Sequence, residues 1–440
     1  MMGDKDIPKK ASSGNGSRKS RKKRGGSKRK MTSEQSSAHN SISEWVFLDQ
    51  RRPGKILDDD FLVPWHQRKE KLVFELHTHS THSDGYLSPS KVVERAHQNG
   101  VKVLSLTDHD TMSGIPDALE AAHRLGIKII PGVEVSTMFS PREESGSEEP
   151  VHILAYYSSC GPTKVDKLEN MLSVIREGRF GRAKNMLLLL NKLKLPLKWE
   201  EVLRIAGKDV APGRVHVARA MVEAGYVENL RQAFDKYLHD GGPAYATGSE
   251  PDMEEAVKLI CETGGVAVLA HPWTLKNPGA IISRLKAAGL KGIEAYRSDG
   301  RVAPYSDLAD TFNLVKLGGS DFHGKVGQEE PELGSVSLPV CAVHEFLKVA
   351  RPIWRSAIAH ILENYIDHPT DSSLQPIMKY GSYYEKPRSI RNSANELISQ
   401  CLASWLTNEE RQNAEFEAIQ QKLCGFSISQ QNTTACALDI

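Results

Sequence analysis

The chain lacks long apolar runs, paired cysteine motifs and any large net charge. No stretch approaches the roughly 18 apolar residues that a membrane-spanning helix needs, and the N-terminus has no apolar core of the signal-peptide type. The formal net charge of the 440 residues is only +2, which excludes a uniformly polycationic protein. None of the cysteines forms a CxxC pair, so we expect neither a disulfide scaffold nor a zinc ribbon. The six are Cys160, Cys261, Cys341, Cys401, Cys424 and Cys436. These absences predict a soluble intracellular protein with no membrane partner.

The few excess positive charges are concentrated near the N-terminus. Nine of the thirteen residues from Arg18 to Lys30 are Lys or Arg. Residues 1–45 have almost no large apolar side chains, so we expect them to be a disordered basic tail. The run resembles a nuclear localisation signal, and the alternative is a solvated tail with weak affinity for RNA. The predicted location is the nucleus or the cytoplasm.

Short β-rich runs alternate with amphipathic helical segments from residue 72 onward. The runs lie at 72–76, 101–107, 127–135, 151–157, 266–271, 292–296 and 314–320. This alternation predicts an α/β protein with a parallel sheet of βα units. Ser88 and Pro89 have the residue types that begin a helix, and Gly126 has the type that ends one.

Two intervals do not follow the βα alternation. Residues 160–250 are expected to be almost wholly helical and to form an insertion between two parts of the sheet domain, 71–159 and 251–345. Beyond residue 345 we expect one helix packed on the core. A polar tail of unassigned function follows, with one amphipathic helix near 407–423.

Histidine, aspartate and glutamate residues recur at or near the ends of the predicted strands. They are His77, His79, Asp84, His109, Glu134, His152, His271, Asp321 and His323, with Asp108 beside them. In a parallel α/β barrel the strand ends converge on one face. Residues two apart on an extended segment point the same way, so His77 and His79 can reach one cation. Imidazole and carboxylate ligands suit zinc, manganese or iron. Nine ligands exceed the needs of one ion, and Glu134 is the expected bridge between two or three ions.

Each of these residues also has an ordinary structural explanation. A single histidine on a strand is usually a core or surface residue, and Asp108 can simply cap the next turn. His82, His97 and His123 fit such explanations. The full set in register with the strand ends does not, so the sequence predicts a metal cluster.

These motifs resemble those of the polymerase and histidinol phosphatase (PHP) superfamily. HTHSTHSDG at 77–85, TDHDT at 107–111 and GGSDFHG at 318–324 occur in that family's order, and the similarity spans about 72–340. The resemblance implies a distorted seven-stranded (βα) barrel and a site for three divalent ions. By analogy, the first ion is held by His77, His79, Glu134 and Asp321, the second by Glu134, His152 and His271, and the third by Asp84, His109 and His323. The metal can be manganese, zinc, iron or magnesium.

The resemblance also implies a phosphoesterase that acts on nucleotides through metal-activated water. The family's stand-alone members include 3′,5′-nucleoside bisphosphate phosphatases and 5′–3′ exoribonucleases that degrade short RNA. The predicted catalytic residues are Glu134, Asp108, Arg214 and His216. The predicted substrate-binding residues are Arg214, His216, Tyr245, Trp273 and Tyr296. For Arg214 the alternative is a structural ion pair, and the aromatic residues can equally serve packing. Two other functions stay open: a phosphatase for a small metabolite such as histidinol phosphate, and a non-catalytic nucleic-acid-binding protein.

Overall fold

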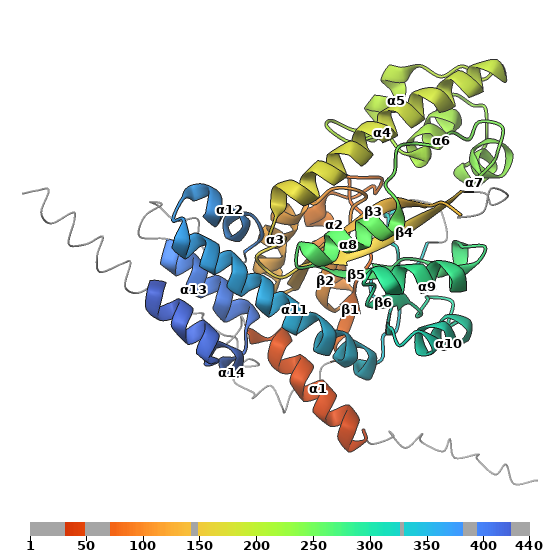
Figure 1. Ribbon diagram of the computed structural model, residues 1–440. Coiled ribbons are helices and arrows are strands. Elements are labelled where there is room, and N and C mark those ends of the chain that lie inside the picture. The colour runs from red at the N-terminus through yellow and green to blue at the C-terminus, as the bar shows by residue number, and fades with distance from the viewer. Residues whose placement is uncertain (1–30, 49–70, 142–147, 326–329, 382–393, 424–440) are drawn as a thin grey trace, which may run out of the picture.

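The computed structural model describes residues 31–48, 71–141, 148–325, 330–381 and 394–423 (Figure 1). The basic run at 18–30 lies outside the described residues. Across the described ranges, none of the helices is both long enough and apolar enough to cross a membrane.

Within these described ranges, seven strands form one sheet, in the spatial order in which they occur along the chain. They are β1 (Val73–Glu75), β2 (Val101–Leu106), β3 (Lys128–Phe139), β4 (Glu149–Tyr156), β5 (Val266–Leu269), β6 (Gly292–Glu294) and β7 (Val315–Leu317). Each lies within or over one of the runs expected from the sequence. The α/β class and the number of strands are therefore confirmed.

Strand β4 runs antiparallel to both of its neighbours, and the expectation of a wholly parallel sheet is wrong here. Residues 140–148 separate β3 from β4. This connection is shorter than the dozen or so residues that a parallel crossover requires, so β4 pairs antiparallel with β3. The start of β4 consequently lies beside the end of β3, where His152 pairs with Ser136. The reversal thus brings His152 to the edge where the parallel strands end.

Main-chain hydrogen bonds join the segments that follow the two outermost strands of the sheet. The His79 amide donates to the Phe322 carbonyl (2.9 Å), and the Asp321 amide donates to the His77 carbonyl (3.0 Å). Gly319 makes the approach possible, because a Cβ at this position would lie 2.4 Å from the Cβ of His77. The sheet is therefore curled, with the first and last groups of expected ligands side by side.

Helices cover the outside of this sheet. They are α2 (Pro89–Gln98), α3 (Ile115–Leu125), α8 (Met253–Glu262), α9 (Pro278–Ala288) and α10 (Ala303–Thr311), with a short 3₁₀ helix η5 (Pro272–Thr274). The predicted ends of the first two are confirmed: the Ser88 hydroxyl accepts from the Lys91 amide, and Gly126 ends α3 with a φ of 69°. Glycine accepts this left-handed conformation without strain.

The interval between β4 and β5 is helical, as the sequence predicts. It contains α4 (Val165–Lys192), α5 (Trp199–Ala206), α6 (Arg214–Glu223), α7 (Leu230–Ala233) and the π-helix η4 (Phe234–Leu238). These helices have an apolar cluster of their own, which includes Met186, Leu190, Val202, Val217 and Met221. In Figure 1 they project beyond the edge of the sheet, and only α4 runs back toward it.

The N-terminal segment is ordered closer to the start of the chain than expected. Helix α1 (Ser33–Val46) begins at a capping box of Thr32 and Gln35. Its Trp45 is fully buried, with ring centroids 6.4 Å from Trp354 and 5.2 Å from Trp405. The expectation of disorder through residue 45 is therefore wrong for 33–45. Few apolar residues suffice because one of them is a tryptophan with two aromatic partners.

The C-terminal part is also more structured than the sequence suggests. It forms α11 (Val340–Asp367), α12 (Asp371–Tyr380), α13 (Ala394–Trp405) and α14 (Asn408–Arg411), and residues 414–423 are helical. The helix expected near 407–423 is present, but α12 and α13 were not expected. Leu397, Ile398, Trp405 and Phe416 are buried in the same core as α11, so this region is not simply a polar tail.

Candidate metal centre and substrate cavity

The first group of expected ligands surrounds one oxygen of Glu134. Nε2 of His77 and Nε2 of His79 each lie 3.1 Å from Oε2 of Glu134. The same two nitrogens lie 3.3 Å and 3.1 Å from Oδ1 of Asp321. One donor atom from each of these four residues lies within 4.8 Å of all the others. The structure thus brings together the four residues predicted for the first ion.

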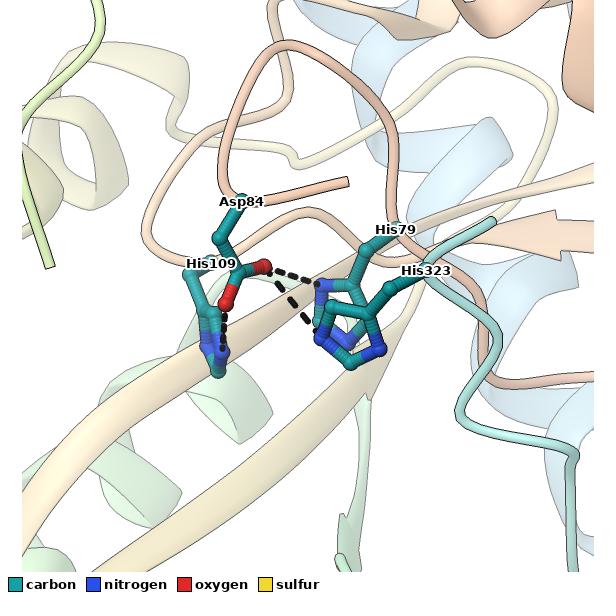
Figure 2. Close-up of side chains that lie close together, drawn as sticks. All are labelled: His79, Asp84, His109 and His323. Carbon is teal, nitrogen blue, oxygen red and sulfur yellow. Dashed lines mark ion pairs between the residues drawn. The ribbon is translucent and has the colours of Figure 1, made fainter. Parts of the chain in front are cut away.

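A second group lies on the other side of His79. Figure 2 shows His79, Asp84, His109 and His323 turned toward one another, with the Asp84 carboxylate between the rings. Oδ1 of Asp84 is 3.3 Å from Nε2 of His323 and 3.8 Å from Nδ1 of His79. Oδ2 is 4.0 Å from Nε2 of His109. His79 therefore lies within reach of this group as well as the first.

A third group uses the other oxygen of Glu134. Oε1 lies 2.9 Å from Nδ1 of His152 and 3.0 Å from Nε2 of His271. Nδ1 of His109 lies 3.3 Å from Oε2. Glu134 therefore contacts members of all three groups, which is the arrangement expected of a bridging carboxylate.

Three buried polar atoms in these groups lack a hydrogen bond within the described part of the chain. They are Nε2 of His79, Oδ1 of Asp84 and Nδ1 of His109. Buried polar atoms are almost always hydrogen-bonded, so such atoms need an explanation. Each lies near atoms of opposite charge without the geometry of a hydrogen bond. Nitrogen and oxygen donors that converge in this way fit the ligands of divalent cations.

The electrostatics keep the two central carboxylates ionised. Burial alone would raise the pKa of Glu134, but His109, His77 and His152 hold this pKa well below its ordinary value. Burial likewise opposes ionisation of Asp84, but His323 and His109 keep its pKa well below the usual range. Metal ligands must be deprotonated, so both carboxylates are in the state that binds a cation.

Two buried glutamates behind the cluster were not predicted from the sequence. Oε1 of Glu294, at the end of β6, lies 3.2 Å from Nδ1 of His77, and its Oε2 accepts from the His271 amide at 2.8 Å. Glu75, at the end of β1, accepts from the amides of Ser320 and Gly334. Carboxylates behind metal-ligating histidines fix the orientation of the imidazole. A charged residue at the end of an otherwise apolar strand is the signal that could have identified them.

The backbone is strained at two of the expected ligands. The φ angles of His271 and Asp321 are 26° and 54°, in a region that residues with a Cβ rarely adopt. Such conformations cost on the order of 1–3 kcal/mol each and occur frequently at functional sites. The Glu294 bond to the His271 amide and the His77 carbonyl bond to the Asp321 amide maintain them.

Asp108, a predicted catalytic residue, supports the loop that carries Asp84. Its carboxylate accepts from the Ser80 amide (2.7 Å), the Ser80 hydroxyl (2.7 Å) and the Ser83 hydroxyl (2.6 Å). It is not a member of any of the three groups of described residues. Asp108 thus has a structural role, but it stabilises an earlier loop and does not cap the turn that follows it.

Arg214 and Tyr245 contact each other. The guanidinium of Arg214 is paired with Asp240 and lies over the Tyr245 ring, 5.7 Å from its centroid. Neither residue belongs to the described lining of the cavity beside the metal groups. The structural ion pair considered from the sequence is therefore the arrangement observed.

His216 does line this cavity. Its Nδ1 accepts from the Gly213 amide at 2.9 Å, which closes the start of α6. Burial lowers the pKa of His216 to about 4, so the ring is neutral near pH 7.

Trp273 and Tyr296 occupy other positions. The Trp273 ring lies 6.3 Å from the His271 ring, with the guanidinium of Arg297 4.4 Å from its centroid. Tyr296 follows β6, and its amide donates to the Leu317 carbonyl. Neither Trp273 nor Tyr296 is among the described residues that line the cavity. Of the two, Trp273 is the one whose ring lies next to an expected ligand, His271.

The cavity has a volume of about 780 Å³ and extends from Asp84 and His109 toward the helical segment. Three arginines that were not predicted line it: Arg176, Arg179 and Arg219. Arg179 Nε donates to Asp110 at 2.7 Å, and Arg219 donates to the Asp84 carbonyl. Guanidinium groups bind phosphate oxygens in a bidentate manner. The pocket beside the metal groups is therefore suited to a phosphorylated ligand.

Comparison with known proteins agrees with this geometry. The family model described as PHP domain matches residues 75–207. The chain is 35% identical over 297 residues to a 3′,5′-nucleoside bisphosphate phosphatase of Chromobacterium violaceum, which covers 66% of this chain and 97% of the relative. It is 34% identical over 261 residues to a 5′–3′ exoribonuclease of Haemophilus influenzae, covering 58% of this chain and 91% of the relative.

A solved structure is similar in both fold and sequence. It is described as an amidohydrolase from Chromobacterium violaceum with bound sulfate and no metal. The TM-score is 0.55 and the identity 32%, over 65% of this chain and 96% of that one. Fold, metal-competent groups and sequence similarity agree, and the chain belongs to the PHP domain family.

Proposed function

We propose that this protein hydrolyses nucleotide phosphate esters, with 3′,5′-nucleoside bisphosphates and short 5′-phosphorylated RNA as its substrates. It is a phosphoric ester hydrolase, the class to which its phosphatase and exoribonuclease relatives belong. The observation that carries the proposal is the presence of three metal-competent groups around Glu134 beside an arginine-lined cavity, whose lining includes the expected ligands Asp84 and His109.

Divalent ions are the cofactor, and three ions are proposed. His77, His79, Glu134 and Asp321 would hold the first, and Asp84, His109 and His323 the third. His152, His271 and Glu134 would hold the second, with His109 also close enough to contribute. Bound ions of this kind lower the pKa of water and polarise phosphoryl oxygens. Manganese, zinc, iron and magnesium are the candidates, because such donor sets accept several metals.

The chain's own residues would bind and orient the phosphate groups. Arg179 is held in the cavity wall by Asp110 and by the Ser136 hydroxyl (2.6 Å). Arg219 lies over the Tyr86 ring, 3.6 Å from its centroid. Fixed guanidinium groups place a phosphate with little loss of entropy on binding. In this proposal, the helical segment 160–250 recognises the substrate, and the neutral His216 can exchange hydrogen bonds with it.

A substrate comparison tests the proposal. Purified protein with added manganese is incubated with adenosine 3′,5′-bisphosphate, a 5′-phosphorylated pentaadenylate or histidinol phosphate. We expect phosphate release from the bisphosphate, or mononucleotides from the RNA, and loss of both products in a His77→Ala/His79→Ala protein. Turnover of histidinol phosphate alone would favour the small-metabolite alternative. Binding of RNA without turnover of any substrate would favour the non-catalytic alternative.

A further inference from the structure

One residue of the cavity lining comes from a helix in the C-terminal part of the chain. Lys379 of α12 lines the cavity together with residues of α4 and of the loop that joins α5 to α6. The PHP model ends at residue 207, and α12 begins at residue 371. This C-terminal helix therefore adds a cation to a pocket otherwise built by the sheet loops and the helical segment.

Packing at the end of α12 fixes the position of Lys379. The adjacent Tyr380 is only 2% exposed. A Cβ at Gly161 would lie 2.2 Å from the Tyr380 ring, so the ring rests directly on the chain before α4. The Nζ of Lys379 lies 5.2 Å from the centroid of this ring. The lysine is thus carried by an anchored helix end at the cavity wall.

The arginines of the cavity are already engaged by the protein. Arg176 pairs with Glu169 and donates to the Asp110 carbonyl at 2.7 Å. Arg179 pairs with Asp110, and Arg219 donates to the Asp84 carbonyl. These three cations therefore have restricted positions and lie near the metal groups.

The two lysines of the cavity differ from the arginines. Among the described residues, neither Lys208 nor Lys379 takes part in an ion pair. Lys208 is exposed, in the loop that follows α5, whereas Lys379 is half-buried. A lysine ammonium is a strongly hydrated point charge on a flexible stem, suited to phosphates that vary in position.

We infer that Lys379 of α12 and Lys208 contact backbone phosphates of RNA beyond the nucleotide being hydrolysed. This inference rests on the proposed function and deepens it, because it assigns a longer substrate to the same site. A nucleoside bisphosphate places its phosphates near the metal groups and the arginines, and it has no further phosphodiester for the two lysines. An oligoribonucleotide carries one additional negative charge for each further residue.

Steady-state kinetics of Lys379→Glu and Lys208→Glu proteins test this assignment. The substrates are adenosine 3′,5′-bisphosphate and a 5′-phosphorylated pentaadenylate, each measured over a range of salt concentration. We expect kcat/KM for the RNA to fall roughly threefold to tenfold in each variant, as for loss of a partly exposed charge contact. The slope of log kcat/KM against log salt should become shallower by about 0.7 per lost phosphate contact. The loss of kcat/KM for the bisphosphate should be much smaller than the loss for the RNA.

Lys258→Glu is the matched control, because Lys258 is an exposed lysine on α8 that does not line the cavity. An equal loss for both substrates, or an RNA salt slope unchanged from the control, would overturn the inference while leaving the proposed function intact. If the wild-type protein hydrolyses neither substrate, it is the proposed function that fails. A circular dichroism melt of each variant shows whether a loss of rate reflects unfolding.

Discussion

At the residue scale, Glu294 determines how His77 presents its ring. Its two oxygens contact Nδ1 of His77 and the amide of His271, and it is itself buried. Removing such a partner from a metal-ligating histidine typically costs about 10–100-fold in metal affinity or activity. We therefore expect Glu294→Gln to weaken metal binding and hydrolysis by about this factor. The exposed Glu255→Gln is the control, and equal behaviour of the two variants would refute the role of Glu294.

His216 gives the protein a stability term that depends on pH. Burial lowers its pKa to about 4, whereas an unfolded histidine titrates near 6.5. Because the unfolded chain takes up this proton more readily than the folded protein, the free energy of unfolding is about 3 kcal/mol higher above pH 6.5 than it is below pH 4. This stability is lost as the pH falls from 6.5 toward 4. His216→Asn keeps an acceptor for the Gly213 amide but does not titrate in this range.

Urea denaturation at pH 7 and at pH 4.5 measures this difference. We expect the free energy of unfolding to fall more steeply for the wild-type protein than for His216→Asn. Between pH 7 and pH 4.5, the free energy of unfolding of the wild-type protein should fall by up to about 3 kcal/mol more than that of His216→Asn. Parallel losses in both proteins would show that His216 does not supply the term.

The sequence predicts the metal-competent residues better than the groups that support them. His77 and His79 form one pair two residues apart after a strand, and Asp321 and His323 form another. This spacing predicts that both side chains of a pair point the same way. Arg179 has no such pattern, because only the path of α4 across the cavity brings it to Asp110.

At the scale of elements, Trp45 is the largest of the buried side chains by which α1 packs on the rest of the protein. Trp45 contacts the rings of Trp354 on α11 and Trp405 on α13. Removing a fully buried tryptophan typically costs about 3–5 kcal/mol. We expect Trp45→Ala to reduce the free energy of unfolding by this amount, measured by urea denaturation. Ser37→Ala on the exposed side of α1 should have almost no effect, and a similar result for both would mean that α1 does not stabilise the core.

The elements that the sequence did not predict depend on partners distant in the chain. Helix α13 has Ser, Asn and Gln among its apolar residues, and its burial becomes clear only when it packs near α1 and α11. The direction of β4 depends on the length of the connection after β3. Its reversal is what places His152 beside Glu134.

At the scale of the whole molecule, the basic run at 18–30 predicts nuclear import. Fusing residues 1–31 to a fluorescent reporter should concentrate the reporter in the nucleus of a eukaryotic cell, because clustered Lys and Arg residues are typical of import signals. A fusion with Lys22, Lys23 and Arg24 replaced by alanine is the control. Equal distribution of both reporters would instead support a solvated tail.

The proposed function requires that the cluster around Glu134 bind divalent ions and use them for hydrolysis. The most direct measurement combines metal content with hydrolysis of adenosine 3′,5′-bisphosphate, for chelator-treated protein before and after addition of manganese. We predict more than one bound ion per chain, hydrolysis only after metal addition, and a loss of roughly two to three orders of magnitude in Glu134→Gln. Full hydrolysis by the metal-free protein, or a Glu134→Gln protein no slower than His97→Ala, would contradict the proposed function.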